Sequence, residues 1–237
     1  MSHSNERYAR HCALRGFGEN AQQKITQASV LVVGAGGLGS PVLQYLVGAG
    51  VGTVGILDND VVAVSNLHRQ VLHTEAAVGI AKVTSAIKQL RELNSTVNLV
   101  GHNLRLTEDN ASTIIGEYDL VVDCSDNFAT RYLIDDVCAE LKTPTVWGVV
   151  GGYYGQVSVF LHSQDGQSLR DLYPQVPAPG TIQEPAETGT YGPACGITGS
   201  IMASQALKLI TGLGSQLIGQ VVLIDALSAE VRTVAFR

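Results

Sequence analysis

Residues 29–39 read Ser-Val-Leu-Val-Val-Gly-Ala-Gly-Gly-Leu-Gly, and this stretch is the strongest indication of the fold. Its first five residues are mostly β-branched and apolar, which is typical of a strand buried in a parallel sheet. Gly34, Gly36 and Gly39 follow in the spacing G-x-G-x-x-G, and a helical pattern then runs over 40–50. A strand, a glycine-rich turn and a helix in this order bind phosphate, because free backbone N–H groups and the helix dipole attract negative charge.

Short apolar strands and helices alternate on either side of this unit. A short helix over 19–28 precedes it as part of an N-terminal helical arm. We expect strands over 54–57, 97–100, 120–122, 145–150 and 156–161, and helices over 79–93, 108–116 and 128–141. No helical pattern separates the last two strands, which are therefore expected to be antiparallel. The alternation predicts an α/β fold, a doubly wound Rossmann-like mixed sheet with antiparallel strands on its C-terminal side.

Residues 163–192 break this alternation. Four prolines with Gly, Gln, Glu and Thr between them leave little regular pattern. A long segment of this kind inside a compact domain is either a functional gate or docking loop, or disordered. Beyond it we expect a helix over 199–211 and a hairpin of strands over 219–225 and 230–236.

Composition limits the classes of protein that this chain can belong to. It has 237 residues, of which 15% are charged, and a formal net charge of −6. This is globular composition, and the acidic balance argues against binding to nucleic acid or to an anionic membrane surface. No apolar run approaches the roughly 20 residues that span a bilayer, and residues 1–15 do not resemble a signal peptide. We therefore expect a single cytoplasmic domain.

Candidate ligand-binding residues follow the second strand. Asp58 ends that strand, where an acidic residue in dinucleotide-binding folds bonds ribose hydroxyls, so NAD is the first ligand to consider. Arg69 and Lys82 follow, and a dehydrogenase has no need of these two cations. A triphosphate does, because cations neutralise the charge that develops on its phosphates. Asn66 and Arg69 are three apart, which places them on one side of a helical turn. Either cation could be an ordinary solvated surface residue, and for Lys82 taken alone that interpretation is favoured.

A further candidate follows the strand over 120–122. Asp126 and Asn127 lie where the carboxyl ends of parallel strands form a ligand-binding crevice. Asp126 could hold Mg²⁺ through oxygen ligands, or it could cap the helix that follows, or do both.

Taken in order, these motifs resemble the ThiF/MoeB/HesA family of bacterial E1-like enzymes, with MoeB-type members the nearest. The resemblance covers essentially the whole chain. It rests on residues 7–11 (Arg-Tyr-Ala-Arg-His), 34–39, 58–60 (Asp-Asn-Asp), 65–70 (Ser-Asn-Leu-His-Arg-Gln), 78–82 (Val-Gly-Ile-Ala-Lys), 124–127 (Cys-Ser-Asp-Asn), 192–193 and 205–208.

The resemblance implies an activity. Family members adenylylate the C-terminal glycine of a ubiquitin-like sulfur carrier of the MoaD/ThiS type with ATP and Mg²⁺, releasing pyrophosphate, for molybdopterin, thiamine or related thiocarboxylate biosynthesis. The whole chain, 1–237, is then one E1-like adenylation domain. It comprises the helical arm 1–28, a nucleotide-binding part 29–150, and a carrier-facing part with a crossover loop 151–237.

The resemblance also assigns roles to residues. Asp58 takes the ribose, Lys82 binds the phosphates, and Asp126 with Asn127 holds Mg²⁺. Arg10 reaches the phosphates of the neighbouring subunit's site, which makes a homodimer the catalytic unit. The nucleotide is further lined by the glycine loop and the segment after Asp58, namely Gly34, Gly36, Gly37, Gly39, Asp60, Ser65, Asn66, Leu67, His68, Arg69 and Gln70. Arg10, Arg69, Lys82 and Asp126 are the expected catalytic residues.

Two departures from the family pattern concern cysteine. Many members hold a structural zinc with two C-x-x-C pairs, but Ser168 and Asp171 stand at the first pair and the sequence has no second one. We therefore expect no zinc. Relatives also carry a loop cysteine that bonds to the carrier, at a position near Pro185 here, whereas 163–194 holds no cysteine. Cys195 follows at the start of a buried helix, where a structural role is favoured over thiol transfer. A separate sulfurtransferase or cysteine desulfurase is then a possible further partner.

Three other functions compete with sulfur-carrier activation. Zinc-less relatives adenylate peptides in natural-product biosynthesis or a modified tRNA base, and the acidic charge counts against tRNA. A non-catalytic scaffold that docks a carrier would have no reason to retain Arg10, Asn66, Arg69, Lys82 and Asp126 together. An NAD-dependent oxidoreductase lacks a plausible acid or base for hydride transfer.

Overall fold

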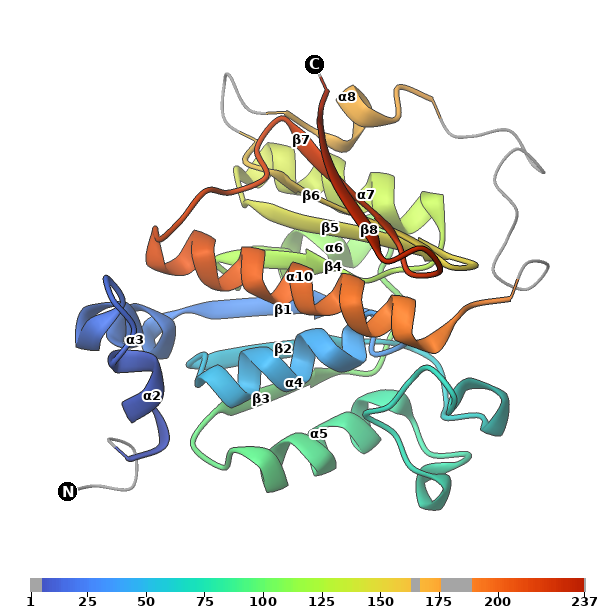
Figure 1. Cartoon of the computed structure of the whole chain (residues 1–237). Coiled ribbons are helices and arrows are strands. Elements are labelled where there is room, and N and C mark those ends of the chain that lie inside the picture. The colour runs from blue at the N-terminus through green and yellow to red at the C-terminus, as the bar shows by residue number, and fades with distance from the viewer. Residues whose placement is uncertain (1–5, 163–166, 176–188, 237) are drawn as a thin grey trace.

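The computed structural model describes residues 6–162, 167–175 and 189–236. Its centre is one eight-stranded sheet in the order β3-β2-β1-β4-β5-β6-β7-β8 (Figure 1). The strands are β1 (Ser29–Val33), β2 (Thr53–Leu57), β3 (Asn98–His102), β4 (Leu120–Asp123), β5 (Thr145–Gly151), β6 (Tyr154–Phe160), β7 (Gln220–Asp225) and β8 (Glu230–Ala235).

The first five strands are parallel, as the alternation of strands and helices predicted. β1 pairs with β2 on one side, Val30 opposite Val54, and with β4 on the other, Val30 opposite Leu120. The strand order therefore reverses at β1 and β4, and α/β sheets bind ligands outside the carboxyl ends of strands at such a point. The glycine loop leaves β1 there.

The antiparallel half is confirmed. β6 runs against β5 with Gly148 opposite Val157, and β7 and β8 continue the sheet in the same sense. The connections from β5 to β6, residues 152–153, and from β7 to β8, residues 226–229, are so short that they can join antiparallel strands only, because parallel strands need a longer crossover.

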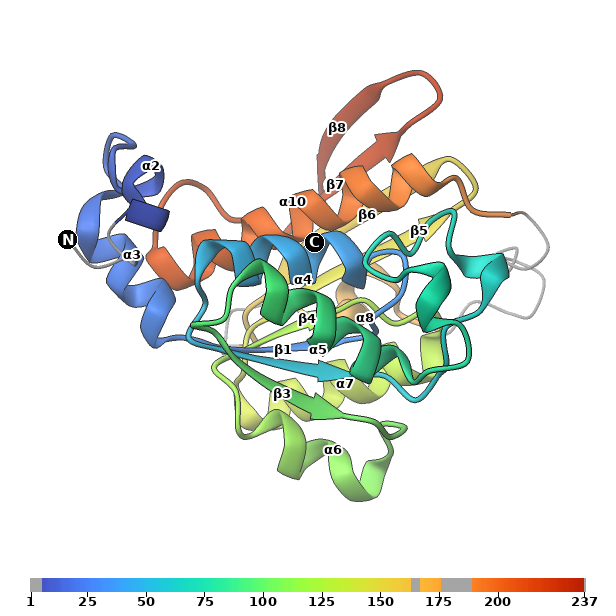
Figure 2. The same cartoon turned by 90° about the horizontal axis from the view of Figure 1, so that it is seen from below.

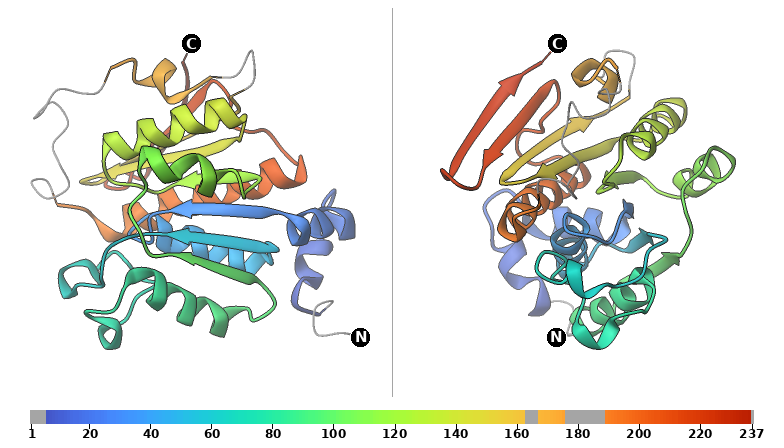
Figure 3. Two further views of the ribbon diagram at one scale, coloured as in Figure 1. Left: turned by 180° about the vertical axis from the view of Figure 1, so that it is seen from behind. Right: turned by 90° about the vertical axis from the view of Figure 1, so that its right-hand side faces the viewer.

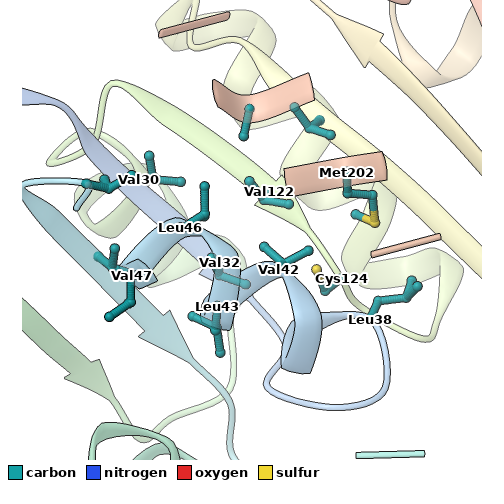
Figure 4. Packing of buried hydrophobic residues seen from close by; sticks show 14 of the residues in the cluster. Val30, Val32, Leu38, Val42, Leu43, Leu46, Val47, Val122, Cys124 and Met202 are labelled. Carbon is teal, nitrogen blue, oxygen red and sulfur yellow. The ribbon is translucent and has the colours of Figure 1, made fainter. Parts of the chain in front are cut away.

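Helices cover both faces of the parallel part (Figures 2 and 3). On one face Val30 and Val32 of β1 pack with α4 (Gly39–Ala49), α5 (Lys82–Leu93) and α10 (Gly192–Thr211), and Figure 4 shows Val42 and Met202 in this cluster. On the other, Leu31 and Val33 pack with α6 (Glu108–Ile115) and α7 (Phe128–Leu141). Alternate residues of one buried strand thus support the two layers.

Two predicted helices have the wrong starting point. Residues 79–81 do not belong to the helix predicted over 79–93, because Gly79 has φ +84° and Ala81 has the non-helical ψ of 133°, so α5 begins at Lys82. The helix predicted over 199–211 begins seven residues earlier, at Gly192, with Pro193 in its first turn. Gly199 there lies so close to α4 that a Cβ would be 2.5 Å from the Pro41 ring, so tertiary packing outweighs the low helix propensity of glycine.

The segment over 163–192 is described in part, and the gate, the docking loop and the position near Pro185 lie outside the described residues. Within it, α8 (Leu169–Leu172) forms a single turn. Ser168 and Asp171 close this turn as a capping box, with the Ser168 N–H donating to Asp171 Oδ2 at 2.8 Å. The Leu169 N–H donates to Asp135 Oδ1 at 2.9 Å. Hydrogen bonds therefore hold this turn at the two positions that the resemblance aligned with the first cysteine pair.

The N-terminal arm consists of α2 (Ala9–Cys12) and α3 (Gly18–Gln27). Tyr8 fixes it to the body: its hydroxyl accepts from Asn94 Nδ2 at 2.9 Å and lies against Gly50, where φ is +81° and a side chain would clash. Gly50 caps the C-terminal end of α4, and the glycine loop lies at the other end. The arm is thus a full helix length, about 16 Å, away from the glycine loop.

Candidate active site

The glycine loop is held by close backbone contacts. The Gly34 N–H donates to the Leu57 carbonyl at 2.7 Å, and Gly34 has φ +98°, which favours glycine. A Cβ on Gly39 would lie 2.0 Å from the Gly34 carbonyl oxygen, so the loop and α4 can meet only without side chains. Within the described part of the chain, the N–H groups of Gly36 and Gly37 donate to no residue. Free donors at the beginning of a helix are suited to binding an anion.

Asp58 joins this loop to the end of β2. Its Oδ2 accepts the Ala35 N–H at 2.8 Å, and its Oδ1 accepts the Asp60 N–H at 2.8 Å. The carboxylate is therefore fixed at the carboxyl end of β2, beside the free N–H groups of the loop, as a ribose-binding residue requires.

Lys82 is no ordinary surface lysine. It is 5% exposed, at the first position of α5, and its Nζ lies 2.9 Å from Asp60 Oδ2 and 3.9 Å from Asp58 Oδ2. Two carboxylates balance the buried charge, which would otherwise be costly. The alternative of a solvated surface cation is wrong.

Residues 65–70 turn back over the loop through a short 3-10 helix, η1 (Val64–Asn66). Arg69 Nη2 donates to Asn66 Oδ1 at 2.9 Å, which confirms that the two share one side of the turn. Arg69 Nη1 lies 3.3 Å from the Ser65 carbonyl and from His68 Nε2. Leu67 is half-buried in the same turn. The guanidinium is thus preorganised by its own segment and retains donors for an anion.

Gln70 lies deepest in this segment. Its side chain is 5% exposed, and its Oε1 has no hydrogen-bond partner among the described residues. A Cβ on Gly36 would come within 3.3 Å of Gln70 Nε2, so the carboxamide faces the glycine loop. An unsatisfied buried amide is costly, which favours a bound partner at this position.

The N-terminus of α10 completes the group. A Cβ on Gly192 would lie 2.5 Å from the His68 carbonyl oxygen, and one on Gly37 would lie 2.8 Å from Cys195 Sγ. Cys195 is buried, and this burial raises the pKa of its thiol to about 11, although Arg69 acts in the opposite sense. The thiol is protonated at neutral pH and is a poor nucleophile.

Asp126 and Asn127 differ in what they do. Asn127, not Asp126, caps α7: its Oδ1 accepts the Thr130 N–H at 2.9 Å. The capping role considered for Asp126 is therefore wrong. The exposed Asp126 carboxylate accepts only from Asn127 Nδ2, at 3.3 Å, among the described residues. Its remaining lone pairs are available to a hard cation.

Arg10 stands apart from all of these groups. It is exposed on α2, at the end of α4 opposite the glycine loop. The fold brings together the other predicted site residues, from the glycine loop, the end of β2, residues 65–70, Lys82 and the end of β4, but it does not bring Arg10 to them.

Comparison with known proteins identifies the family of this chain. Residues 8–237 match the ThiF family. The chain belongs to the ThiF family.

Its relatives include curated adenylyltransferases. A sulfur carrier protein adenylyltransferase of Thermus thermophilus is 48% identical over 236 residues, which cover 98% of this chain and 87% of that protein. The probable adenylyltransferase/sulfurtransferase MoeZ of Mycobacterium tuberculosis is 44% identical, but this chain spans only 60% of its length. Among solved structures, MccB of E. coli with MccA-N7isoASN has a TM-score of 0.86 at 20% identity, covering 98% of this chain and 72% of that one, and PaaA has 0.84 at 20%. These structures share the fold.

In this ThiF-family chain the sequence reasoning missed two buried polar residues beside the site. Asp123 ends β4, is 1% exposed, and accepts the Ser125 N–H at 2.9 Å. Burial raises its pKa, with Arg131 acting in the opposite sense. The position of Asp123 at the carboxyl end of a central strand could have indicated that it lies beside the site. His73, 5% exposed, lies behind the glycine loop and carried no signal of its own.

The described residues contain neither a cluster of metal-binding side chains nor a membrane-spanning helix. In that part of the chain no three His, Cys, Asp or Glu side chains are arranged to hold a metal ion. Nor does any described helix combine the length and apolarity needed to cross a bilayer.

Proposed function

We propose that this chain uses ATP to adenylylate the C-terminal glycine of a small ubiquitin-like sulfur-carrier protein. The observation that carries the proposal is the convergence of free loop N–H groups, two cations and an exposed carboxylate at the carboxyl ends of β1, β2 and β4. Relatives that are named adenylyltransferases, similar over nearly the whole chain, support it.

The chemistry needs positioning and charge rather than a nucleophilic side chain. A carrier carboxylate oxygen attacks the α-phosphorus of ATP, the bond from phosphorus to the bridging oxygen breaks, and pyrophosphate leaves with that electron pair. The carboxylate is already ionised at neutral pH, so no general base is required. Because two anions must meet, Arg69 and Lys82 are suited to lowering the barrier.

Asp126 fits a magnesium site. A single exposed carboxylate is a normal protein contribution to Mg²⁺, which takes its other ligands from water and substrate phosphates. Asn127 orients that carboxylate through its Nδ2. The ion would neutralise charge on the departing pyrophosphate.

The carrier would meet the part of the chain over 151–237. Tyr153, Tyr154 and Leu227 are 43%, 59% and 70% exposed, and the Ala226 N–H donates to the Tyr153 carbonyl at 3.0 Å. Tyr153 and Tyr154 lie at the turn between β5 and β6, beside the beginning of α10, and Leu227 lies at the turn between β7 and β8. Both turns are at the carboxyl end of β5, and the hairpin of β7 and β8 projects from the body (Figure 2). Exposed aromatic and aliphatic side chains are common in protein-binding surfaces.

A homodimer would supply Arg10. The arm presents Arg10 to solvent, away from its own site. Beside the arm, a groove of about 330 Å³ lies between Phe17, Tyr45 of α4 and α10, and Tyr45 is 58% exposed. We expect a second copy of the chain to cover this groove. Arg10 of one copy would then reach the nucleotide phosphates bound in the site of the other copy. A mixture of inactive Arg10→Ala and Lys82→Ala chains should then regain activity, because one of the two sites in each mixed dimer has both groups.

Sulfur transfer is assigned to another protein. Cys195 is buried and protonated at neutral pH, so a separate sulfurtransferase or cysteine desulfurase would convert the acyl-adenylate. Nucleic acid and membranes are not proposed as partners, and the cytoplasm is the proposed location.

The proposal is tested by ATP–pyrophosphate exchange with Mg²⁺ and a panel of small Gly-Gly-terminated proteins and short peptides. Exchange that depends on one carrier protein is the expected result. Exchange with a peptide alone would replace the proposed substrate class, and ATP binding without exchange would favour the scaffold.

A further inference from the structure

His73 connects three elements behind the glycine loop. It is buried, and both ring nitrogens are bonded: Nδ1 lies 2.9 Å from Ser85 Oγ on α5, and Nε2 lies 2.8 Å from the Ala35 carbonyl oxygen. A carbonyl oxygen can only accept, so Nε2 carries the proton. Burial has the largest effect and lowers the pKa of His73, while the bond to Ala35 acts in the opposite sense and the charges of Lys82 and Asp58 oppose each other. The ring is therefore neutral at pH 7, and Nδ1 accepts from the Ser85 hydroxyl.

The Ala35 residue is therefore fixed on both sides. Its N–H donates to Asp58 Oδ2 at 2.8 Å, and its carbonyl accepts from His73. In a trans peptide the C=O and the following N–H point in opposite directions. By holding the Ala35 carbonyl, His73 sets the direction of the Gly36 N–H, which has no partner among the described residues and faces away from the imidazole.

These bonds form a closed circuit with the ion pair of the site. Ser85 and Lys82 are three residues apart on α5, on one side of the helix. From Lys82 the circuit continues to Asp58 at 3.9 Å, then through Ala35 to His73 and back to Ser85. The phosphate-binding N–H, the ribose-binding carboxylate and the cation thus depend on one another for position.

We propose that His73 is a positioning residue for the nucleotide: it fixes the glycine loop so that the Gly36 N–H and Asp58 are preorganised for ATP. The inference rests on the proposed function. A binding site whose donors are held before the ligand arrives loses less conformational entropy on binding, so loosening the loop weakens affinity without removing any ligand contact.

The test is equilibrium binding of ATP to the full chain without carrier. His73→Leu should raise the Kd for ATP at least about tenfold, since a lost buried hydrogen bond is worth about 1.4 kcal/mol or more. His73→Gln, whose amide can donate to Ala35, should restore binding to within about threefold. In pyrophosphate exchange, the KM for ATP should rise more than the KM for the carrier.

His102 provides a matched control. Its Nε2 lies 2.8 Å from the Tyr118 hydroxyl, and burial lowers its pKa too. The His102 side chain lies outside the circuit, and only its backbone carbonyl, which a substitution keeps, accepts the Asp58 N–H at 3.3 Å. His102→Leu should lower the melting temperature and leave the Kd for ATP unchanged.

Two results would overturn the inference: a folded His73→Leu chain that binds ATP like the wild type, or a His73→Gln chain that binds no better than His73→Leu. If His73→Leu does not fold, Ser85→Ala takes its place, with an expected two- to threefold rise in Kd, and an unchanged Kd would count against the inference. Failure of the proposed function appears differently, as a wild-type chain that binds no ATP or supports no exchange.

Discussion

Lys82 and Asp60 form an ion pair whose two ends differ sharply in exposure. The Lys82 side chain is 6% exposed and that of Asp60 is 62% exposed, with 2.9 Å between Nζ and Oδ2. An exposed carboxylate can move into solvent at little cost, whereas the buried ammonium stays near Asp58. The pair is therefore suited to opening toward a phosphate, with Asp60 as the partner that leaves.

This relationship separates a phosphate-binding role of Lys82 from a purely structural one. Lys82→Ala should lower adenylate formation about 100-fold or more, because a cation at the developing charge is lost. Asp60→Asn removes the same ion pair but keeps the cation, and should alter the rate only a few fold. Pyrophosphate exchange with both variants decides the point. Equal losses in the two would mean that the ion pair alone matters.

Asp126 gives the second prediction. Asp126→Ala should abolish adenylate formation and leave the melting temperature nearly unchanged, because the side chain is exposed and does not cap α7. Asn127→Ala removes the cap and should lower the free energy of unfolding by about 1 kcal/mol. Thermal unfolding and exchange measured across a range of Mg²⁺ concentrations distinguish the two. Unchanged turnover in Asp126→Ala would remove this carboxylate from the mechanism.

Gly37 and Cys195 allow a test by compensation. A methyl group on Gly37 would lie 2.8 Å from Cys195 Sγ, so Gly37→Ala should displace the loop or α10 and raise the Kd for ATP at least about tenfold. Removing the sulfur opens that space, because the remaining Cβ of residue 195 lies at 3.4 Å. The double variant with Cys195→Ala should regain most of the lost affinity.

The single Cys195→Ala chain serves as the control for that pair. It should keep adenylation activity, since the thiol is protonated and buried. Loss of adenylation in this variant would show that the sulfur takes part in the chemistry. No recovery in the double variant would show that Gly37 is needed for a reason other than space.

Local pattern was sufficient for much of the fold. α7 has the predicted bounds, 128–141, and the loop at Gly34 joins β1 to α4 as expected, because strand, turn and helix signals coincide there. α10 was predicted seven residues too short because Gly192, Gly196 and Gly199 lower its helical propensity. The close approach of Gly199 to Pro41 of α4 and of Gly192 to the His68 carbonyl explains two of these glycines, and both are contacts between distant segments.

The site was predictable where several signals agreed. Asp58 was expected at the site because of its place after the second strand. Arg69 was expected near the glycine loop because the motifs, in their order, resemble those of the family. A local pattern could not say whether Asp126 or Asn127 caps α7, since both residue types do so. His73 was unpredictable because its role depends on Ala35, a contact between distant segments.

A buried pair beneath α8 gives the last prediction, on pH. Asp135 Oδ1 lies 3.8 Å from His162 Nε2, and both side chains are buried. Burial raises the pKa of Asp135 to about 6, so between pH 4 and 6 the native chain keeps a proton that the unfolded chain loses, and stability falls as pH rises. Burial lowers the pKa of His162 to about 4, so between pH 4 and 6.5 the unfolded chain holds the extra proton, and stability rises with pH.

The two groups change the free energy of unfolding with pH in opposite directions, and a variant of each residue should show the effect of the other. Asp135→Asn removes the first, so its stability should rise more steeply than that of the wild type from pH 4.5 to 7, and its amide oxygen can still accept from Leu169. His162→Gln removes the second, so its stability should instead fall toward neutral pH relative to the wild type. From pH 4.5 to 7 each difference should amount to about 2 kcal/mol, since one pKa unit is worth about 1.4 kcal/mol and only part of each shift falls in this range. Urea unfolding at the two pH values measures them. Variants that track the wild type at both would mean that this pair titrates alike in the native and unfolded chains.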